Sequence, residues 1–484
     1  MPVSDQHSEY IANKDKWQLG RDTVEGSDAV KGSRSNGESK SEAGLHNVAG
    51  ARYLPPPNPN DNSQENIDRY TAYKIRASYV NFTGHTKDGF MGMIGRKNPT
   101  VELEAKLEYA KENVNGAGIG LQGLIQSTIS DLLDVGRYGL LSDFPQSNGG
   151  SKEVTSGLQA CVKCYPAESI VNWREETIDG NTVLTMVVLS EEVEKVASDG
   201  FGVECVKYHR VLFLDSGIYK QKLYDENDEL IVNNDKDGNI EEIIPKKFDG
   251  STWGEIPFVF VGTENNDPKP DKATLYDLAE INIAHYRNSA DFEESSFLVG
   301  QATPVIAGLT QAWVKDVLKG GIQLGSRTAI LLPESASATL LQADPNSMPK
   351  IGMEMKEEQM IKTGAKIISD SGGVETAEAA KIRFAGQNSK LGLVVLNTEK
   401  AIIRTLSWLS EFMGGTGENE LEINKQFYEA TVNPQLLVAN MQLMDRGVIA
   451  KSDLRAQMRK SGQINSDRTD EDIDLEVGNI DPML

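Results

Sequence analysis

Three glycines form the pattern closest to a nucleotide-binding site. Gly118, Gly120 and Gly123 spell G-x-G-x-x-G within NGAGIGLQG. In dinucleotide-binding folds this turn follows a β-strand, so that backbone N–H groups and a helix N-terminus meet the pyrophosphate. Here the preceding residues, 101–114, have a helical pattern. We therefore interpret the glycines as a turn between two helices and predict no cofactor at this position.

A second run, NNDKDGNIE at 233–241, imitates the first nine positions of a calcium-binding EF-hand loop. The twelfth position of such a loop supplies a bidentate glutamate, and here it is Ile244, with β-like rather than helical flanks. The pattern favours a β-hairpin turn, and adventitious cation binding is the alternative.

Three cysteines and a histidine supply the donor types that zinc prefers. They are Cys161, Cys164, Cys205 and His209. On an extended strand, residues three apart point to opposite faces and residues four apart lie roughly 13 Å apart. Tetrahedral zinc needs four donors within about 2.3 Å of one ion. We interpret these residues as ordinary small side chains, with zinc as the alternative. Three cysteines are also too few for a disulfide framework and indicate a reducing compartment.

Motifs of hydrolytic and phosphoryl-transfer enzymes do not occur in the sequence. It has no G-x-S-x-G, no Walker lysine motif and no H-E-x-x-H. His85, His285 and the scattered acids form no acid/base pair in sequence. We predict no catalytic residue, no metal and no cofactor, and keep as an alternative a soluble enzyme whose site is assembled from distant residues.

Composition narrows the classes of partner. The 484 residues carry a net charge of −23 and are 39% hydrophobic, and no apolar run approaches the roughly 20 residues of a membrane span. The N-terminus lacks the pattern of a secretion signal. A strongly acidic chain does not grip nucleic acid over a broad surface. It fits a solubilising surface, or a wall past which polyanions slide.

The first half of the chain combines helices with an antiparallel sheet. Residues 1–50 are rich in Ser, Gly and Lys and predict a flexible arm. Helices are expected at 65–86, where Ile67, Tyr70 and Tyr73 share one face, and at 100–114 and 119–138. Short β-rich runs over 159–261, separated by turns such as Asp179-Gly180 and Asp237-Gly238, predict an antiparallel meander.

The second half predicts a stalk with a tip. A long polar helix at 273–298 and a charged helix at 351–368 enclose short β-like runs at 303–345, with a helix at 309–320. A further long helix at 374–413 carries expected kink points at Gly386 and Gly392, and the tail is helical. A helix that is polar on most faces is a spacer or packs against other chains through polar contacts, and we favour the second. The fold class is α+β.

Several stretches resemble the portal proteins of tailed bacteriophages, within a subgroup catalogued as a domain of unknown function. The resemblance is carried by YLPPP (53–57), RASYVNFTGHTKDGFMGMIGRKNP (76–99), WGEIPFVFVG (253–262), LAEINIAHYRNSADFEESSFLVGQATPVIAG (278–308), ETAEAAKIRFAGQNSKLGLVVLNTEKAI (375–402) and LLVANMQLMDRGVIAKSDLRAQM (436–458). Together they span most of residues 50–460.

The resemblance implies a portal fold and a ring of about twelve copies at one capsid vertex, a channel for packaging and ejection of double-stranded DNA. It divides the chain into a wing with mixed helices and antiparallel strands, two stem helices, a small α/β clip and a helical crown. The implied ranges are a flexible arm at 1–50, wing at 51–271, stem helix at 272–299, clip at 300–350, second stem helix at 351–371, tunnel loop and kinked wing helix at 372–433, and crown with acidic tail at 434–484.

The implied partners are further copies of the chain, transiently the packaged DNA, the terminase large subunit, the major capsid and scaffolding proteins, and head-completion or tail adaptor proteins. No membrane is implied. The implied location is the virion, after assembly in the bacterial cytoplasm. Another virion connector, a scaffold protein and a soluble enzyme are the alternatives.

Two sets of charged residues are candidates for function. Pairing between neighbouring stems is predicted for Asp291, Glu293, Glu294, Lys356, Lys362 and Lys366, with a solvated helix face as the alternative. Brief contacts with DNA phosphates are predicted for Lys381, Arg383 and Lys390, with plain surface charge as the alternative.

Overall fold

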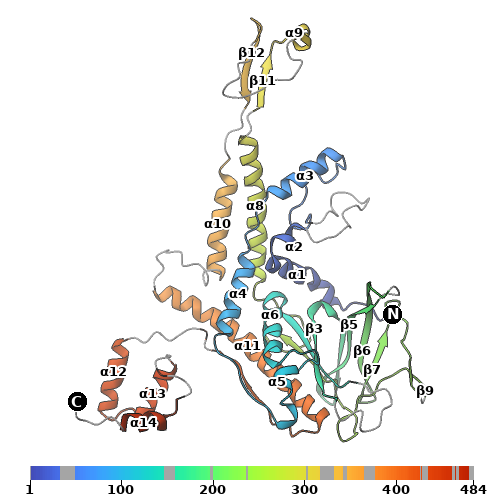
Figure 1. Ribbon diagram of the computed structural model, residues 1–484, viewed down its shortest axis with the longest axis vertical. Helices are drawn as coiled ribbons and strands as arrows, with labels where there is room; N and C mark the ends of the chain where they lie inside the picture. Colours follow the sequence, from blue (N-terminus) through green and yellow to red (C-terminus); the bar gives the residue numbers. More distant parts are fainter. Residues whose placement is uncertain are drawn as a thin grey trace.

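The computed structural model describes residues 2–32, 50–145, 158–196, 200–235, 238–300, 303–316, 332–341, 346–364, 377–425, 427, 434–460, 464 and 468–478. Figure 1 shows a body of helices and strands, from which a pair of helices rises as a stalk with a small β tip. Three C-terminal helices form a lobe beside the body. Helices and antiparallel sheets are combined throughout, which confirms the predicted α+β class.

The centre of the body is a three-stranded antiparallel sheet that packs against two helices. Its order is β10 (Phe258–Gly262), β2 (Arg137–Asp143) and β3 (Cys161–Pro166). Helices α6 (Leu121–Val135) and α11 (Ala377–Met413) pack against β2 and β10 and share one hydrophobic core with them. Strand β2 is buried along its whole length, including the polar residues Arg137, Ser142 and Asp143, so its sequence does not alternate as that of a half-buried strand does.

A four-stranded meander forms the second sheet of the body. Its strands are β4 (Ile170–Ile178), β5 (Asn181–Val196), β6 (Val203–Asp215) and β7 (Ile218–Tyr224), each antiparallel to the next. Asp179 and Gly180 both have positive φ, as the two-residue turn between β4 and β5 requires. The predicted meander is confirmed. A further hairpin pairs β8 (Asn233–Asp235) with β9 (Gly238–Ile240).

Two predicted helices of the first half are wrong in part. The helix expected at 100–114 is instead β1 (Thr100–Glu102), the 3-10 turn η2 (Ala105–Leu107) and α5 (Ala110–Asn113). Strand β1 pairs with β13 (Glu420–Glu422), more than 300 residues away. That partner stabilises an extended conformation which local periodicity cannot indicate.

The helix expected at 65–86 is broken into α3 (Gln64–Arg76) and α4 (Phe82–Ile94). The Asn81 side chain accepts a hydrogen bond from the Gly84 N–H and so caps α4, which fixes the break. Tyr70 and Tyr73 are buried together with Ile67 against them, so the shared face predicted for these three residues is confirmed.

The prediction of a flexible arm over 1–50 is wrong for residues 2–32. They form α1 (Ser8–Glu25) and α2 (Ser27–Lys31), and α1 contacts α4, α6 and α8. Trp17 is buried against Val135 and Ala167. Gly20 lies so close to the end of α6 that a Cβ there would meet the Asp134 carbonyl oxygen at 2.1 Å. The polar composition of this segment did not indicate that Trp17 is buried or that Gly20 lies at a close contact between two helices.

The long helix α11 passes without interruption through Gly386 and Gly392, so these glycines do not break it. The lobe consists of α12 (Pro434–Asp445), α13 (Lys451–Lys460) and α14 (Asp470–Gly478). Among the residues described, none of the helices combines the length and the apolar character that a membrane crossing needs.

Candidate functional site: the helical stalk and its tip

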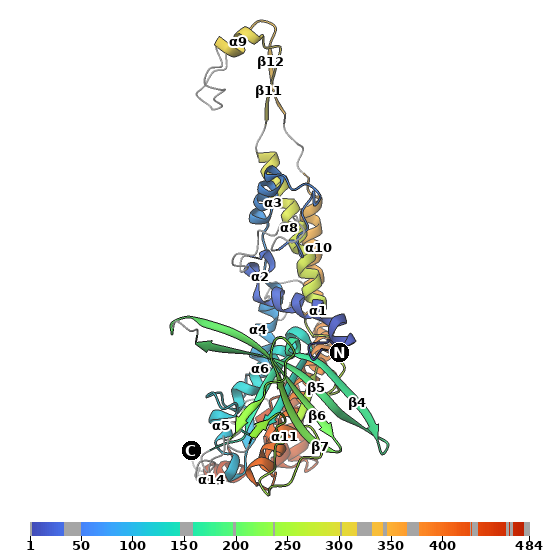
Figure 2. The ribbon, with the colours of Figure 1, turned by 90° about the vertical axis from the view of Figure 1, so that its right-hand side faces the viewer.

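The stalk is an antiparallel pair of helices that leaves the body. It consists of α8 (Tyr276–Gly300) and α10 (Met348–Thr363), which lie side by side in both views (Figures 1 and 2). At about 1.5 Å per residue, α8 is roughly 38 Å long. His285 of α8 lies 3.1 Å from Glu357 of α10. A Cβ at Gly352 would meet the Asn288 side chain at 2.2 Å, so the glycine permits the close approach of the two helices.

The polarity of α8 is explained largely within its own chain. The buried Asn282 side chain accepts hydrogen bonds from the Thr83 N–H at 3.1 Å and the Thr83 hydroxyl at 3.0 Å, and it donates to the Val80 carbonyl at 2.9 Å. Ser289 accepts from the Ser78 N–H at 2.8 Å and donates to its carbonyl at 2.6 Å. These polar residues hold the segment that connects α3 to α4. The prediction that α8 packs against other chains through its polar residues is therefore wrong for this face.

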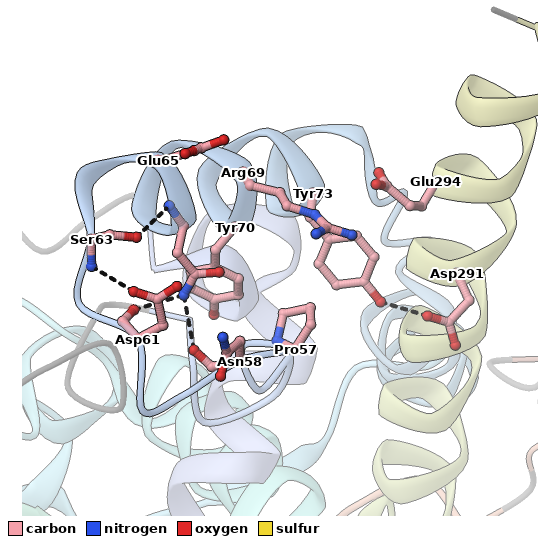
Figure 3. Close-up of a pocket in the computed structure, with 11 residues that line it drawn as sticks. Pro57, Asn58, Asp61, Ser63, Glu65, Arg69, Tyr70, Tyr73, Asp291 and Glu294 are labelled. Atoms are coloured by element: carbon pink, nitrogen blue, oxygen red, sulfur yellow. Dashed lines mark hydrogen bonds between the residues drawn. The ribbon is translucent and has the colours of Figure 1, made fainter. Parts of the chain in front are cut away.

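A polar cavity lies between α3 and the upper half of α8. Its volume is about 520 Å³, and its lining includes Asp61, Glu65, Arg69, Asp291 and Glu294. Figure 3 shows Tyr73 reaching from α3 toward Asp291, and its hydroxyl donates to that carboxylate at 2.6 Å. Burial and this hydrogen bond raise the pKa of Tyr73 above its ordinary value. Four carboxylates beside one arginine give the cavity an acidic character.

Two of the predicted stem residues are already engaged within the chain. Asp291 accepts from Tyr73, and Glu294 forms an ion pair with Arg76, whose guanidinium also covers the Phe297 ring at 4.2 Å. These contacts fasten α3 to α8. Sequence reasoning assigned both acids to neighbouring copies because their partners lie 218 residues away.

The remaining stem candidates do not form a network in the described part of the chain. Lys362 lies 3.7 Å from Glu358 one turn before it, and both side chains are exposed, so this pair contributes little to stability. Glu293 and Lys356 are half-buried. Lys366 lies outside the described residues.

One face of α10 carries exposed apolar side chains among its charged residues. Met348, Ile351 and Met355 of α10 are exposed and recur at three- and four-residue spacing, which places them on one face of the helix. Phe297 and Leu298, near the end of α8, are exposed as well. The other end of α10 enters the body, where Met360 belongs to the main core. An exposed apolar stripe on a helix that has left its own core is a candidate interaction surface.

The tip continues this apolar surface. Strand β11 (Thr303–Ala307) pairs with β12 (Ser337–Leu341), and α9 (Gln311–Asp316) lies beside them. Leu340 and Leu341 are exposed. An isolated two-stranded sheet is marginally stable in water, so a tip of this kind gains stability from a partner surface.

The predicted DNA contacts are placed only in part. Lys390 is exposed on α11, beside a small cavity of about 110 Å³ that Glu264 and Lys272 also line. Lys381 and Arg383 lie on the first turns of the same helix, and their side chains are outside the described residues. The structure therefore brings Lys390 into a mixed-charge surface and does not test the proposed cluster of three.

The glycine motif, the EF-hand-like run and the cysteines have the following geometry. Gly118 and Gly120 connect α5 to α6, so the glycine motif is a turn between helices, as predicted. The pairing of β8 with β9 confirms the predicted hairpin in the EF-hand-like run. Cys161 is buried, Cys164 half-buried and Cys205 exposed, all as free thiols. Within the described part of the chain, no group of three or more His, Cys, Asp and Glu side chains is arranged to hold a metal ion.

A cluster that the sequence did not indicate anchors α1 below the stalk. Arg21 donates to both carboxylate oxygens of Asp131, at 2.6 and 2.9 Å, and to Glu168 at 3.0 Å. Asp134 pairs with Lys87 at 2.6 Å, and its other oxygen is buried with no hydrogen-bond partner among the described residues. Burial, opposed in part by Lys87 and Arg21, raises the pKa of Asp134 to about 6. The residues of α1 gave no signal of this cluster, because the partners of Arg21 lie far along the chain.

Comparisons with known proteins cover different parts of the chain. Residues 274–413 match the family described as "Domain of unknown function (DUF4055)". This match agrees with the subgroup named from the sequence, and it spans the stalk, the tip and α11. No curated protein matches the chain.

Among solved structures, the chain is similar to a chain of the "Virion of native gene transfer agent (GTA) particle", at 15% identity and a TM-score of 0.38. It is also similar to a chain of the "Neck of empty GTA particle computed with C6 symmetry", at 14% identity and a TM-score of 0.38. Each likeness covers 80% of this chain and 92% of the other.

Proposed function

We propose that this chain is the subunit of a portal-type ring at one vertex of a capsid, and that double-stranded DNA passes through the ring. The observation that carries the proposal is the exposed apolar stripe of α10, formed by Met348, Ile351 and Met355. These side chains stand on a stalk that projects from the body (Figure 2). Covering them with another surface removes apolar area from water and so favours association.

Further copies of the same chain are the partner that fits this surface best. Stalks that stand side by side cover one another's stripes, and a repeated contact of this type closes into a ring when its rotation divides a full turn. The acidic contacts of Asp291 and Glu294 hold α3 against α8 within each copy. That arrangement leaves the α10 side of the stalk for the neighbour.

The charge of the chain suits a conduit for DNA. With 49 basic and 72 acidic residues the net charge is −23, so each copy as a whole repels phosphate. Repulsion lets a duplex slide without adhering. Isolated cations such as Lys390, exposed on α11, offer brief contacts at most. The chain then acts as a passive channel, and the terminase motor supplies the work of packaging.

The tip supplies the docking surface for other particle components in this proposal. Leu340 and Leu341 lie at the far end of the stalk, where a packaging motor and later head-completion or tail adaptor proteins have access. The body faces the capsid and its scaffolding proteins. These assignments follow the portal resemblance, and the exposed apolar tip is the feature of this chain that supports them.

Native mass spectrometry of the full-length protein tests the proposal. The expected result is a closed oligomer of about twelve copies, with few intermediate species, because a ring gains its last contact only on closure. A monomer or dimer at every concentration, with and without capsid proteins, would overturn it and favour a soluble enzyme. A short open series of oligomers would favour another connector or a scaffold.

A further inference from the structure

Strands β5 and β6 continue past both of their neighbours and form a projecting arm. The pairing of β4 with β5 ends at Leu189, and the pairing of β7 with β6 ends at His209. Beyond these points, residues 190–196 and 203–208 pair only with each other among the described strands. At about 3.4 Å per residue the arm is roughly 24 Å long. Figure 2 shows it extending to the left of the body.

The arm has an apolar end on one face, and toward its base the same face carries Glu192 and Glu194, with Lys207 opposite Glu192. Val196 lies opposite Val203 across the ribbon, and Glu194 and Glu192 follow along the same strand with the same orientation, because successive side chains alternate. All four side chains are exposed. Phe201, at the turn, is 96% exposed. A two-stranded ribbon is marginally stable alone, and an apolar end of this kind gains stability from burial.

A cavity with complementary chemistry lies between the first half of α1 and the start of α8. Its volume is about 380 Å³. Its apolar lining consists of Ala12, Trp17, Val135, Pro270, Ala273 and Tyr276. Lys16, Lys269 and Lys272 also line it and are exposed. The carboxylate of Asp271 is turned inward, where it accepts the backbone N–H groups of Glu264 and Asn265. Glu9 also lines the cavity and is half-buried, and Lys272 pairs with Asp277 at 2.5 Å. Lys16 and Lys269 therefore remain as the exposed cations of the rim, in a chain that is acidic as a whole.

The other large cavities do not fit the arm. The cavity beside α3 is lined by four carboxylates, which repel the glutamates of the arm. A cavity of about 330 Å³ on the meander contains three cations, but each is paired with a carboxylate of its own chain. Those pairs are Lys163 with Asp143, Arg210 with Glu191, and Lys222 with Glu242.

We infer that the β5–β6 arm of one copy docks in the α1–α8 cavity of the next copy, an inference that rests on the ring proposed above. The valines of the arm cover Ala12 and Tyr276, and Glu192 and Glu194 face Lys16 and Lys269. In Figure 2 the arm lies on the left and the start of α1, beside the N label, lies on the right at a similar height. Complementary patches on opposite sides of a subunit are what a head-to-tail contact in a closed ring requires.

Disulfide trapping between two singly labelled proteins tests the docking. One full-length protein carries Val203→Cys and the other Ala12→Cys, both with Cys205→Ser to remove the exposed natural thiol of the arm. Mixed rings should give a heterotypic dimer on oxidation, and neither protein should give it alone. Asp68→Cys, exposed on α3, replaces Ala12→Cys as the matched control and should give at least about tenfold less product.

The possible outcomes distinguish a failure of the arm docking from a failure of the proposed ring. Rings that form but give no Val203–Ala12 product, or as much product with Asp68→Cys, would overturn the docking and leave the proposed function standing. Absence of rings in the unmodified protein would overturn the proposed function and the docking together. Preferential Val203–Ala12 product within rings supports both.

A charge exchange gives an independent readout. Glu192→Lys with Glu194→Lys should raise the concentration at which rings dissociate at least about tenfold, and so should Lys16→Glu with Lys269→Glu. Combining all four changes should return it to within about threefold of the original value, since the pairs are restored with opposite sign. Thermal melts of each variant establish that the subunit is folded. Loss of rings in folded variants without rescue in the combination would contradict the assignment.

Discussion

Asn282 and Thr83 lie 199 positions apart in the sequence, and the Asn282 side chain accepts hydrogen bonds from both the backbone N–H and the hydroxyl of Thr83. Both residues are buried. This contact fixes the first turn of α4 to the first half of α8, so it attaches the stalk to the N-terminal helices of the body. It also accounts for a polar residue in the middle of a helix that the sequence assigned to contacts between chains.

Replacement of Asn282 by alanine should therefore destabilise the subunit. The change leaves the Thr83 N–H and hydroxyl buried without their acceptor, which costs about 2–3 kcal/mol in the free energy of unfolding. Urea denaturation of the full-length protein measures this. Asn62→Ala, at an exposed position before α3, is the control and should change stability by less than about 0.5 kcal/mol. Equal stability of the two variants would contradict the role of Asn282.

Replacement of Gly20 by alanine should detach α1 from α6. The added Cβ would stand 2.1 Å from the Asp134 carbonyl oxygen, a backbone atom that cannot move away cheaply. We expect a loss of about 1–3 kcal/mol and faster hydrogen exchange in α1. Gly392→Ala is the matched control, since a Cβ there meets nothing within 4 Å, and it should stabilise the protein by about 0.5–1 kcal/mol. Unchanged exchange in α1 of the Gly20 variant would show that residues 8–25 are not tightly packed.

Asp134 should make stability depend on pH. Its pKa in the folded state is raised to about 6, above the ordinary value of about 3.9, so folding favours the protonated form. The contribution of this proton to stability is complete below about pH 4 and is lost as the pH rises through about 6. The amide introduced by Asp134→Asn does not titrate. The unfolding free energy of the variant relative to the natural protein should therefore rise between about pH 4 and pH 7, by up to about 3 kcal/mol.

Denaturant titrations at both pH values measure this difference. Asp68→Asn, on the exposed side of α3, controls for the loss of one negative charge and should show a much smaller trend. A difference that falls as the pH rises would mean that Lys87 and Arg21 outweigh the burial of the carboxylate.

Charge reversal at Lys390, Lys381 and Arg383 should impair DNA packaging and leave ring formation intact. The three cations lie on the first half of α11, where the proposal places the DNA path. Lys400→Glu, an exposed change farther along the same helix, is the control and should leave packaging within about twofold. A packaging assay with assembled capsids measures both. If reversal dissolves the ring, these residues are structural; if packaging is unaffected, they do not meet DNA.

The sequence indicated much of the second half of the fold and less of the first. Helices α8 and α10, the strands of the tip and the β4–β7 meander have periodicities that local residues determine, so they were found within a few positions. Strand β2 was missed because it follows α6 directly, in LLDVGRYGLLSD, where only the left-handed Gly136 separates helix from strand. Strand β1 depends on β13, which no local window contains.

The sequence predicted the helices and strands of the candidate site but not the contacts between them. A stalk with a tip followed from two polar helices around a β insert. The partners of Asp291 and Glu294, however, are Tyr73 and Arg76 of α3, and no pattern in either helix pairs them. The apolar stripe of α10 was overlooked because Met348, Ile351 and Met355 alternate with charged residues in a helix that reads as polar on average.

Electron microscopy of the purified full-length protein, beside Met355→Lys, tests most directly whether copies assemble through their stalks. The account predicts closed rings with bundled stalks and an axial opening wide enough for a duplex. It predicts that Met355→Lys dissociates them, while Ile75→Lys, an equally exposed change on α3, leaves them intact. Single separated subunits from the unmodified protein, or rings that survive Met355→Lys unchanged, would contradict it.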